Sequence, residues 1–134
     1  MSDVLVLEVR LGELQGSGSW VYAWLGAQGV VYVGATGLHP ATRTWLHLTD
    51  EDPNVGRVRA RYPGWDAEEL DVVALRLPDE EDRQAVKHAV VRLLRERGML
   101  SPRQVCDPPA ETPPSASAER LVDALSERQA AARP

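Results

Sequence analysis

The chain has 134 residues and a formal net charge of −5 at pH 7, and 43% of its residues are hydrophobic. This length and composition predict one domain with a single modest core. No stretch approaches the ~18 consecutive apolar residues of a membrane span, and the start of the chain lacks the basic region of a signal peptide. We therefore expect a soluble, cytoplasmic protein without a membrane partner. The single cysteine, Cys106, excludes an internal disulfide and a cysteine-based zinc site.

The first predicted elements are β-strands. Residues 3 to 11 form an apolar run with partial alternation, which predicts a strand that extends the sheet. Residues 12 to 19 contain three glycines and two serines and predict a flexible connection.

A β-hairpin follows. Two runs rich in Val, Tyr and Trp flank a turn bounded by Gly26 and Gly29, and each run has a tyrosine at its centre, Tyr22 and Tyr32. A three-residue loop at residues 26 to 28 would place the two tyrosines opposite each other on one face. A two-residue loop would change the parity and point them to opposite faces. The residues alone permit both registers.

Residues 39 to 48 predict a helix. Pro40 suits the first turn, where a missing N–H costs nothing. On this helix Arg43 and His47 are neighbours one turn apart on the same face. A charged loop then ends the helix.

Residues 55 to 62 predict a short basic helix that carries Arg57, Arg59 and Arg61. An acidic protein lacks the general positive field that attracts nucleic acid, so any such contact requires a local basic patch of this kind. Two interpretations remain open. The arginines contact phosphates, or they lie on a solvated helix and pair with the acidic residues 50 to 52.

The remaining core elements are a strand at residues 70 to 77 and a helix from residue 79 to residue 97, which ends at Gly98. A stripe of apolar side chains at helical spacing predicts the core-facing side of that helix. Its members are Val86, Ala89, Val90, Leu93 and Leu94.

The composition changes after Cys106. Residues 107 to 114 are rich in proline and predict a stiff, extended linker. Residues 118 to 132 predict a last helix whose thin apolar content indicates weak docking or fraying. We therefore divide the chain into a domain of residues 1 to 106 and a tail of residues 107 to 134. The expected fold class is α/β of the α+β kind: a small mixed or antiparallel sheet of three strands plus an N-terminal strand, flanked by helices.

The hairpin and the helix after it resemble the GIY-YIG nuclease superfamily. The Trp-Val-Tyr22 segment stands where the family has Gly-Ile-Tyr, and Tyr32-Val-Gly stands where it has Tyr-Ile-Gly. Arg43 follows Tyr32 by 11 residues and His47 follows one helical turn later, both close to the family's spacing. The resemblance covers roughly residues 18 to 100. It implies the register in which the tyrosines share a face.

The resemblance implies cleavage of DNA phosphodiesters with Mg²⁺ or another divalent cation. A tyrosine, Tyr22 or Tyr32, would act as the general base or orient it. Because a free tyrosine has a pKa of ~10, it needs positive neighbours for this role. Arg43 would bind the phosphate with two parallel hydrogen bonds. His47 would donate a hydrogen bond to the phosphate or shuttle a proton.

The last helix departs from the family pattern. Lys87 stands where the family has its metal-binding glutamate, and an ammonium group repels Mg²⁺. Two explanations remain open. In the first, Glu80 or Glu81 reaches the metal; Glu80 is the candidate on the same face. In the second, the site has lost its metal and leaves a cationic pocket that binds phosphate without cutting. That pocket would contain Tyr22, Tyr32, Arg43, Arg83 and Lys87, with Arg57 and Arg59 as further phosphate contacts.

Three functions are therefore consistent with the sequence. The first is a nuclease that acts on DNA in repair, restriction or mobile-element processing. The second is a degenerate module that binds a nucleic-acid backbone or a nucleotide without hydrolysis. The third is an interaction scaffold that contacts a protein partner through the tail of residues 107 to 134.

Overall fold

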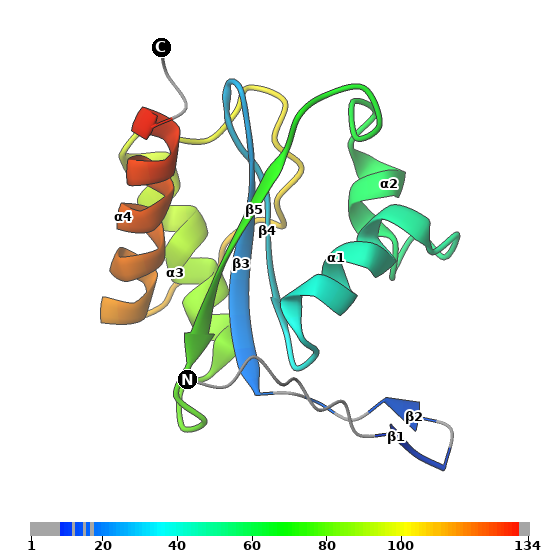
Figure 1. The fold of residues 1–134 in the computed structure, drawn as a ribbon. Coiled ribbons are helices and arrows are strands. Elements are labelled where there is room, and N and C mark those ends of the chain that lie inside the picture. The colour runs from blue at the N-terminus through cyan, green and yellow to red at the C-terminus, as the bar shows by residue number, and fades with distance from the viewer. Residues whose placement is uncertain (1–8, 12, 15, 17, 132–134) are drawn as a thin grey trace.

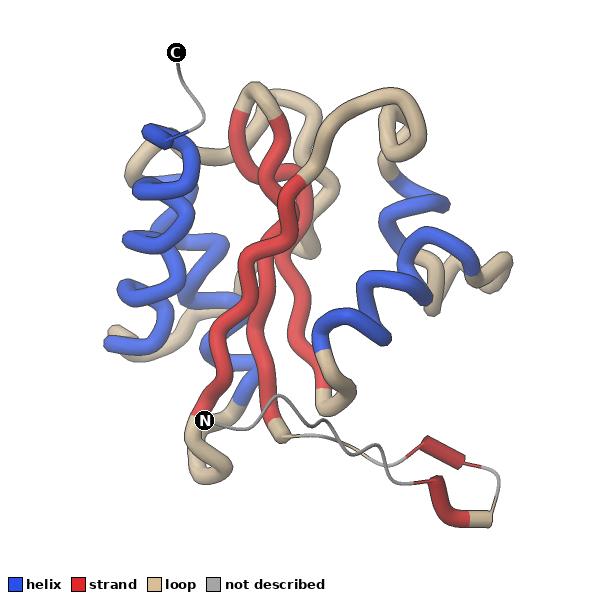
Figure 2. The backbone as a smooth tube through the Cα atoms, viewed as in Figure 1, coloured by secondary structure: helices blue, strands red, loops and turns tan. Residues whose placement is uncertain are grey.

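Three antiparallel strands form a central sheet that lies between two layers of helices in the computed structural model, which describes residues 9–11, 13–14, 16 and 18–131 (Figures 1 and 2). The strand order is β4-β3-β5. The elements are β3 (Ser19–Gly26), β4 (Gly29–Thr36), α1 (Pro40–Thr49), α2 (Arg57–Arg61), β5 (Asp71–Leu77), α3 (Arg83–Glu96) and α4 (Ala116–Ala131). The expected α+β class with an antiparallel sheet is confirmed.

The N-terminal strand differs from the expectation. Two short strands, β1 (Val9–Arg10) and β2 (Glu13–Leu14), pair with each other in a separate two-stranded sheet. Leu11, between them, has a left-handed φ of 53°. In the described part of the chain this strand therefore folds back on itself and does not extend the central sheet. Residues 3 to 8 of the predicted strand lie outside the described residues.

The hairpin has a different register from the one we predicted. Gly26 pairs with Gly29, so the loop contains two residues and not three. A β-bulge then inserts Val31 into β4 between the partners of Trp24 and Leu25. Because a bulge shifts the pairing by one residue, it restores the parity that the short loop had changed. Tyr22 and Tyr32 consequently share a face, with ring centroids 6.4 Å apart, although they are not direct partners.

Tyr22 is paired with Gly34, not with Tyr32. A Cβ on Gly34 would lie only 2.5 Å from Cζ of Tyr22. The glycine therefore leaves the space that the Tyr22 ring occupies, which gives a packing reason for the glycine of the Tyr32-Val-Gly segment.

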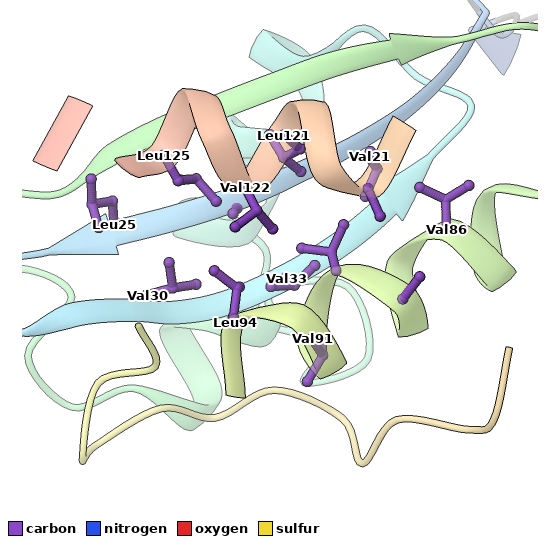
Figure 3. Close-up of a cluster of buried hydrophobic side chains, with 14 of the residues drawn as sticks. Val21, Leu25, Val30, Val33, Val86, Val91, Leu94, Leu121, Val122 and Leu125 are labelled. Atoms are coloured by element: carbon purple, nitrogen blue, oxygen red, sulfur yellow. The ribbon is translucent and has the colours of Figure 1, made fainter. Parts of the chain in front are cut away.

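One face of the sheet packs against α3 and α4 in the larger hydrophobic core (Figure 3). The predicted stripe of α3 is confirmed: four of its members are buried, and Leu93 is partly buried against the same core. Helix α4 packs more tightly than its sequence indicated, because Leu121, Val122 and Leu125 are at most 1% exposed. The prediction of weak docking or fraying is wrong. This core is continuous across the boundary that we placed at residue 106.

The other face carries the tyrosines and is covered by α1 and α2. Tyr22, Trp24 and Tyr32 lie in a second buried cluster with Val58 and Tyr62. The predicted basic helix exists, but α2 spans only five residues, Arg57–Arg61. None of the helices in the described part of the chain is long and apolar enough to cross a membrane.

After α3 the chain runs beside β4 and forms hydrogen bonds along it. Val30 N–H donates to the carbonyl of Met99 at 2.9 Å, and Val105 N–H donates to the carbonyl of Val31 at 2.7 Å. Gly29, with φ of 124°, lets the segment after α3 lie close to β4, because a Cβ there would lie 2.6 Å from the Met99 carbonyl oxygen. The residue bonded by Val105 is the bulged one. This path brings Asp107 to the tyrosine face of the sheet.

Candidate functional site

A pocket of about 310 Å³ lies at the tyrosine face of the sheet. Its chemistry comes from five elements and the segment that follows α3. The side chains that carry it are Tyr22, Tyr32, Arg43, Arg57, Lys87 and Asp107. The sequence therefore predicted five of the six, and the structure brings those five together.

His47 lies behind Tyr22 and is completely buried. Its Nε2 is 2.6 Å from Oη of Tyr22, and its Nδ1 accepts a hydrogen bond from Val58 N–H at 3.4 Å. Burial, assisted by the charges of Arg43 and Arg57, lowers the pKa of His47 to about 3. The imidazole is therefore neutral at pH 7. Its buried position does not fit direct contact with a phosphate, which was one of the two expected roles.

The contacts of His47 fix its tautomer. A backbone N–H can only donate, so Nδ1 must carry the lone pair that accepts from Val58. The single proton of the neutral ring is then on Nε2, and Nε2–H donates to Oη of Tyr22. The hydroxyl proton of Tyr22 is therefore not used toward His47 and is available to a ligand in the pocket.

Tyr22 is a donor and not a base in this arrangement. Burial raises the pKa of Tyr22 far above its ordinary value of 10, and the neighbouring Tyr32 adds to this effect. The positive charge of Arg43 acts in the opposite direction but is outweighed. The positive neighbours that a basic tyrosine requires are thus present, yet they do not compensate for the loss of water.

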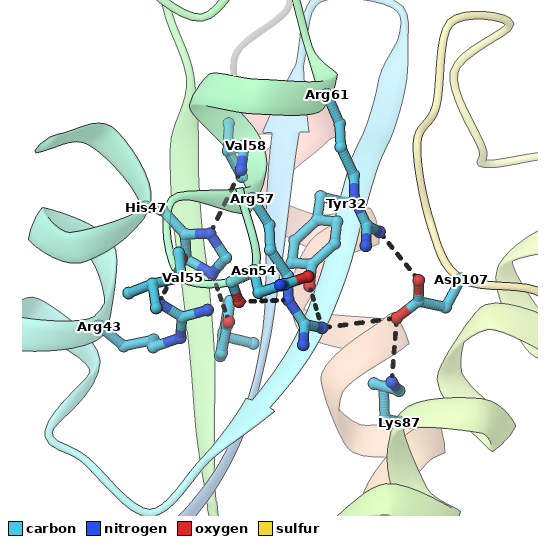
Figure 4. Close-up of polar contacts among 11 residues, drawn as sticks. Tyr32, Arg43, His47, Asn54, Val55, Arg57, Val58, Arg61, Lys87 and Asp107 are labelled. Carbon is cyan, nitrogen blue, oxygen red and sulfur yellow. Dashed lines mark hydrogen bonds and ion pairs between the residues drawn. The ribbon is translucent and has the colours of Figure 1, made fainter. Parts of the chain in front are cut away.

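The hydroxyl of Tyr32, like that of Tyr22, accepts a hydrogen bond from a neighbouring side chain. Its Oη accepts a hydrogen bond from Nη1 of Arg57 at 3.4 Å (Figure 4). Since that oxygen accepts from a guanidinium, the Tyr32 hydroxyl proton is also available for donation. Both tyrosine hydroxyls therefore offer donors to the pocket.

Arg43 reaches the pocket from α1. Its Nη1 donates to the carbonyl of Val55 at 2.8 Å, which ties α1 to the loop that precedes α2. One N–H of a five-donor group is used in this bond, so the guanidinium retains donors for a ligand.

Lys87 and Asp107 form an ion pair at the far side of the pocket (Figure 4). Lys87 is buried, and its Nζ lies 3.4 Å from Oδ2 of Asp107. Arg61 donates to Oδ1 of Asp107 at 2.8 Å, and Arg57 lies 3.7 Å from Oδ2. Burial alone would raise the pKa of Asp107, but the hydrogen bond from Arg61 and the charge of Lys87 together lower it below its usual value. Asp107 is therefore a carboxylate at neutral pH.

Three predicted residues lie elsewhere. Arg59 donates to the carbonyl of Leu48 at 3.2 Å and covers the ring of Trp65 at 5.1 Å. Arg83 lines a neighbouring pocket beside Gly37. Glu80 is exposed in the turn before α3, because that helix begins only at Arg83. None of the three lines the tyrosine pocket, so Arg83, one turn from Lys87 on α3, does not join it there.

The donor set of the pocket does not fit the divalent cation that the resemblance implies. Asp107 is the one carboxylate among the described residues that line it, and its oxygens already bond Arg61 and Lys87. Mg²⁺ and Ca²⁺ are held by several oxygen ligands. In the described ranges of the chain, no group of three or more His, Cys, Asp or Glu side chains could hold a metal ion.

Asp107 is the residue of this pocket that the sequence did not reveal. We placed it at the start of a linker, because prolines follow it and the composition changes there. The signal was weak: two apolar residues, Val105 and Cys106, precede it, and both are partly buried against the sheet.

Comparison of the chain with models of protein families, with curated proteins and with solved structures found no match.

Proposed function

We propose that this chain binds the phosphate backbone of a nucleic acid through the pocket between Tyr22, Tyr32, Arg43, Arg57 and Lys87, and that it does so without cleaving it. One observation carries the proposal: apart from Asp107, the ionisable side chains of the pocket present hydrogen-bond donors or positive charge. A phosphate group, which has only acceptor oxygens and a negative charge, is complementary to such a set.

The roles of the donors follow from their chemistry. Arg43 and Arg57 offer planar guanidinium groups, which match two phosphate oxygens at once. Lys87 offers a point charge. The hydroxyls of Tyr22 and Tyr32 add neutral donors, whose directions are set by His47 behind one and by Arg57 beside the other.

The test is the affinity for a fluorescein-labelled 12-nucleotide single-stranded DNA, measured by fluorescence anisotropy at low salt. Arg57→Gln should weaken binding about tenfold, the usual effect of removing a hydrogen bond between charged groups. Arg59→Gln is the matched control. It makes the same substitution two residues away on α2, but Arg59 faces Trp65 and not the pocket. We expect less than a twofold change there.

Equal losses in the two variants would contradict the proposal, because they would indicate general attraction to a basic helix and not binding in the pocket. Absence of any DNA binding by the wild-type protein would contradict it as well.

Metal-dependent cleavage of DNA is the second candidate. The observation that favours it is the grouping of Tyr22, Tyr32 and Arg43 at one pocket, as the nuclease resemblance implies. The test is incubation with supercoiled plasmid and Mg²⁺ or Mn²⁺. Nicking that requires metal and is lost in both Tyr32→Phe and Arg43→Ala would establish a nuclease and overturn the proposal of binding without cleavage.

The same assay examines the position of Lys87. Cleavage by Lys87→Glu but not by the wild-type protein would identify a disarmed nuclease, in which a lysine has replaced the metal-binding glutamate. No cleavage by either protein, together with pocket-dependent DNA binding, is the result that the proposal predicts.

A further inference from the structure

Asp107 introduces a negative charge into a pocket that otherwise attracts anions. Its Oδ2 lies 3.4 Å from Lys87 Nζ and 3.7 Å from Arg57 Nη1. Both of these cations line the pocket. The carboxylate thus pairs with the same groups that a phosphate would use.

The backbone keeps Asp107 at this position. Two residues earlier, Val105 N–H donates to the carbonyl of Val31 at 2.7 Å. Three residues later, Ala110 N–H donates to Nδ1 of His88 at 3.2 Å. The backbone is therefore held to the fold on both sides of Asp107, and this keeps the Asp107 carboxylate at the pocket.

The third partner of Asp107 is different. Arg61 makes the shortest contact, 2.8 Å to Oδ1, but Arg61 does not line the pocket. When a phosphate binds to Arg57 and Lys87, the hydrogen bond between Arg61 and Asp107 can remain. The Asp107 carboxylate then loses two charged partners but keeps the third, which avoids the free-energy cost of leaving its charge unpaired.

We propose that Asp107 sets the affinity of the pocket as an internal competitor: a bound phosphate replaces the Asp107 carboxylate at Arg57 and Lys87, and Arg61 holds the carboxylate that has been replaced. This inference rests on the proposed function of the pocket, and it adds a residue that determines how strongly an anion binds there.

The first test is the affinity of Asp107→Asn for the labelled 12-nucleotide DNA. Affinity should rise about tenfold, the order of one partly screened charge interaction. Asp123→Asn is the matched control, because it removes one negative charge on α4 and one surface ion pair, with Arg97 just after the end of α3. We expect less than a twofold change there. Unchanged or weaker binding by Asp107→Asn overturns the inference.

The second test is a double-mutant cycle with Arg61→Gln. In the wild-type background this substitution should weaken DNA binding, because Asp107 then turns fully toward Arg57 and Lys87. In the Asp107→Asn background it should have little effect. An equal loss in both backgrounds would indicate that Arg61 contacts the DNA directly, and it would overturn the exchange.

Two further measurements keep the tests decisive. Asp107→Ser removes the same charge and replaces Asp107→Asn if circular dichroism shows that the asparagine variant does not fold. The Arg57→Gln variant separates the two proposals. If it weakens binding while Asp107→Asn does not strengthen it, the pocket function stands and the competitor role fails. If neither the wild-type protein nor the Asp107 variants bind DNA, both fail.

Discussion

At the scale of residues, one backbone amide determines the direction of a hydroxyl group in the pocket. Val58 N–H occupies Nδ1 of His47, which forces the ring proton onto Nε2 and makes Tyr22 Oη an acceptor. The Tyr22 proton is consequently free to bind an anion. A tyrosine that acted as a base would have to lose this proton, but burial raises the pKa of Tyr22 and holds the proton in place. Local geometry at Tyr22 therefore favours binding over catalysis.

His47 gives the folded protein a specific dependence on pH. Burial lowers the pKa of His47 from 6.5 to about 3, so between these values the unfolded chain binds a proton that the folded chain does not. The contribution of His47 to stability is fully present above pH 6.5, and it should fall by roughly 5 kcal/mol as the pH drops to about 3. Urea unfolding at a series of pH values measures this loss.

The control for this prediction is His47→Gln, whose neutral amide can accept from Val58 and donate to Tyr22 without titrating. Its unfolding free energy should change less between pH 6.5 and pH 4 than that of the wild-type protein. A parallel decrease in both proteins would show that other groups cause the acid sensitivity.

At the scale of elements, the sequence predicted the helices that local residue patterns determine. It did not predict the features that depend on contacts between segments far apart in the chain. The period of the apolar residues located α3, and Pro40 marked the first turn of α1, on which Arg43 and His47 then lie one turn apart. The bulge at Val31 was not predictable, because its carbonyl bonds Val105, which lies 74 residues away. The position of Asp107 depends on the same pairing between distant segments. The sequence therefore predicted the tyrosines and cations of the pocket but not its carboxylate.

Helix α4 shows how a thin apolar stripe can still form core. Leu121 is 1% exposed and packs with α3 and the sheet. Leu121→Ala should therefore lower the free energy of unfolding by about 3 kcal/mol, through lost burial and a residual cavity. Chemical denaturation measures the change. Leu11→Ala is the control, because Leu11 is fully exposed and should change stability by less than about 0.5 kcal/mol. A small effect at Leu121 would restore our first prediction of a weakly docked tail.

At the scale of the whole molecule, the charge of the chain and the charge of the pocket have opposite signs. The protein carries −5 overall, yet the pocket gathers Arg43, Arg57 and Lys87 against a single carboxylate. Long-range attraction to nucleic acid is therefore weak, and the binding that we propose must arise close to the pocket. The sequence indicated this requirement for a local patch. It did not indicate that Arg59 and Arg83 would lie outside that patch.

The salt dependence of DNA binding tests this local origin. Each phosphate that is neutralised on single-stranded DNA adds about −0.7 to the slope of log K against log salt concentration. Arg57 and Lys87 share one phosphate in our proposal, so we expect a slope of about −1.4 if Arg43 binds a second phosphate. Arg57→Gln should make the slope less steep by up to about 0.7, because Lys87 alone then holds that phosphate, whereas Arg59→Gln should leave the slope unchanged. Anisotropy titrations at several salt concentrations measure the slopes. A slope near −5 would require about seven phosphate contacts, more than this pocket offers, and it would place the DNA on a wider surface.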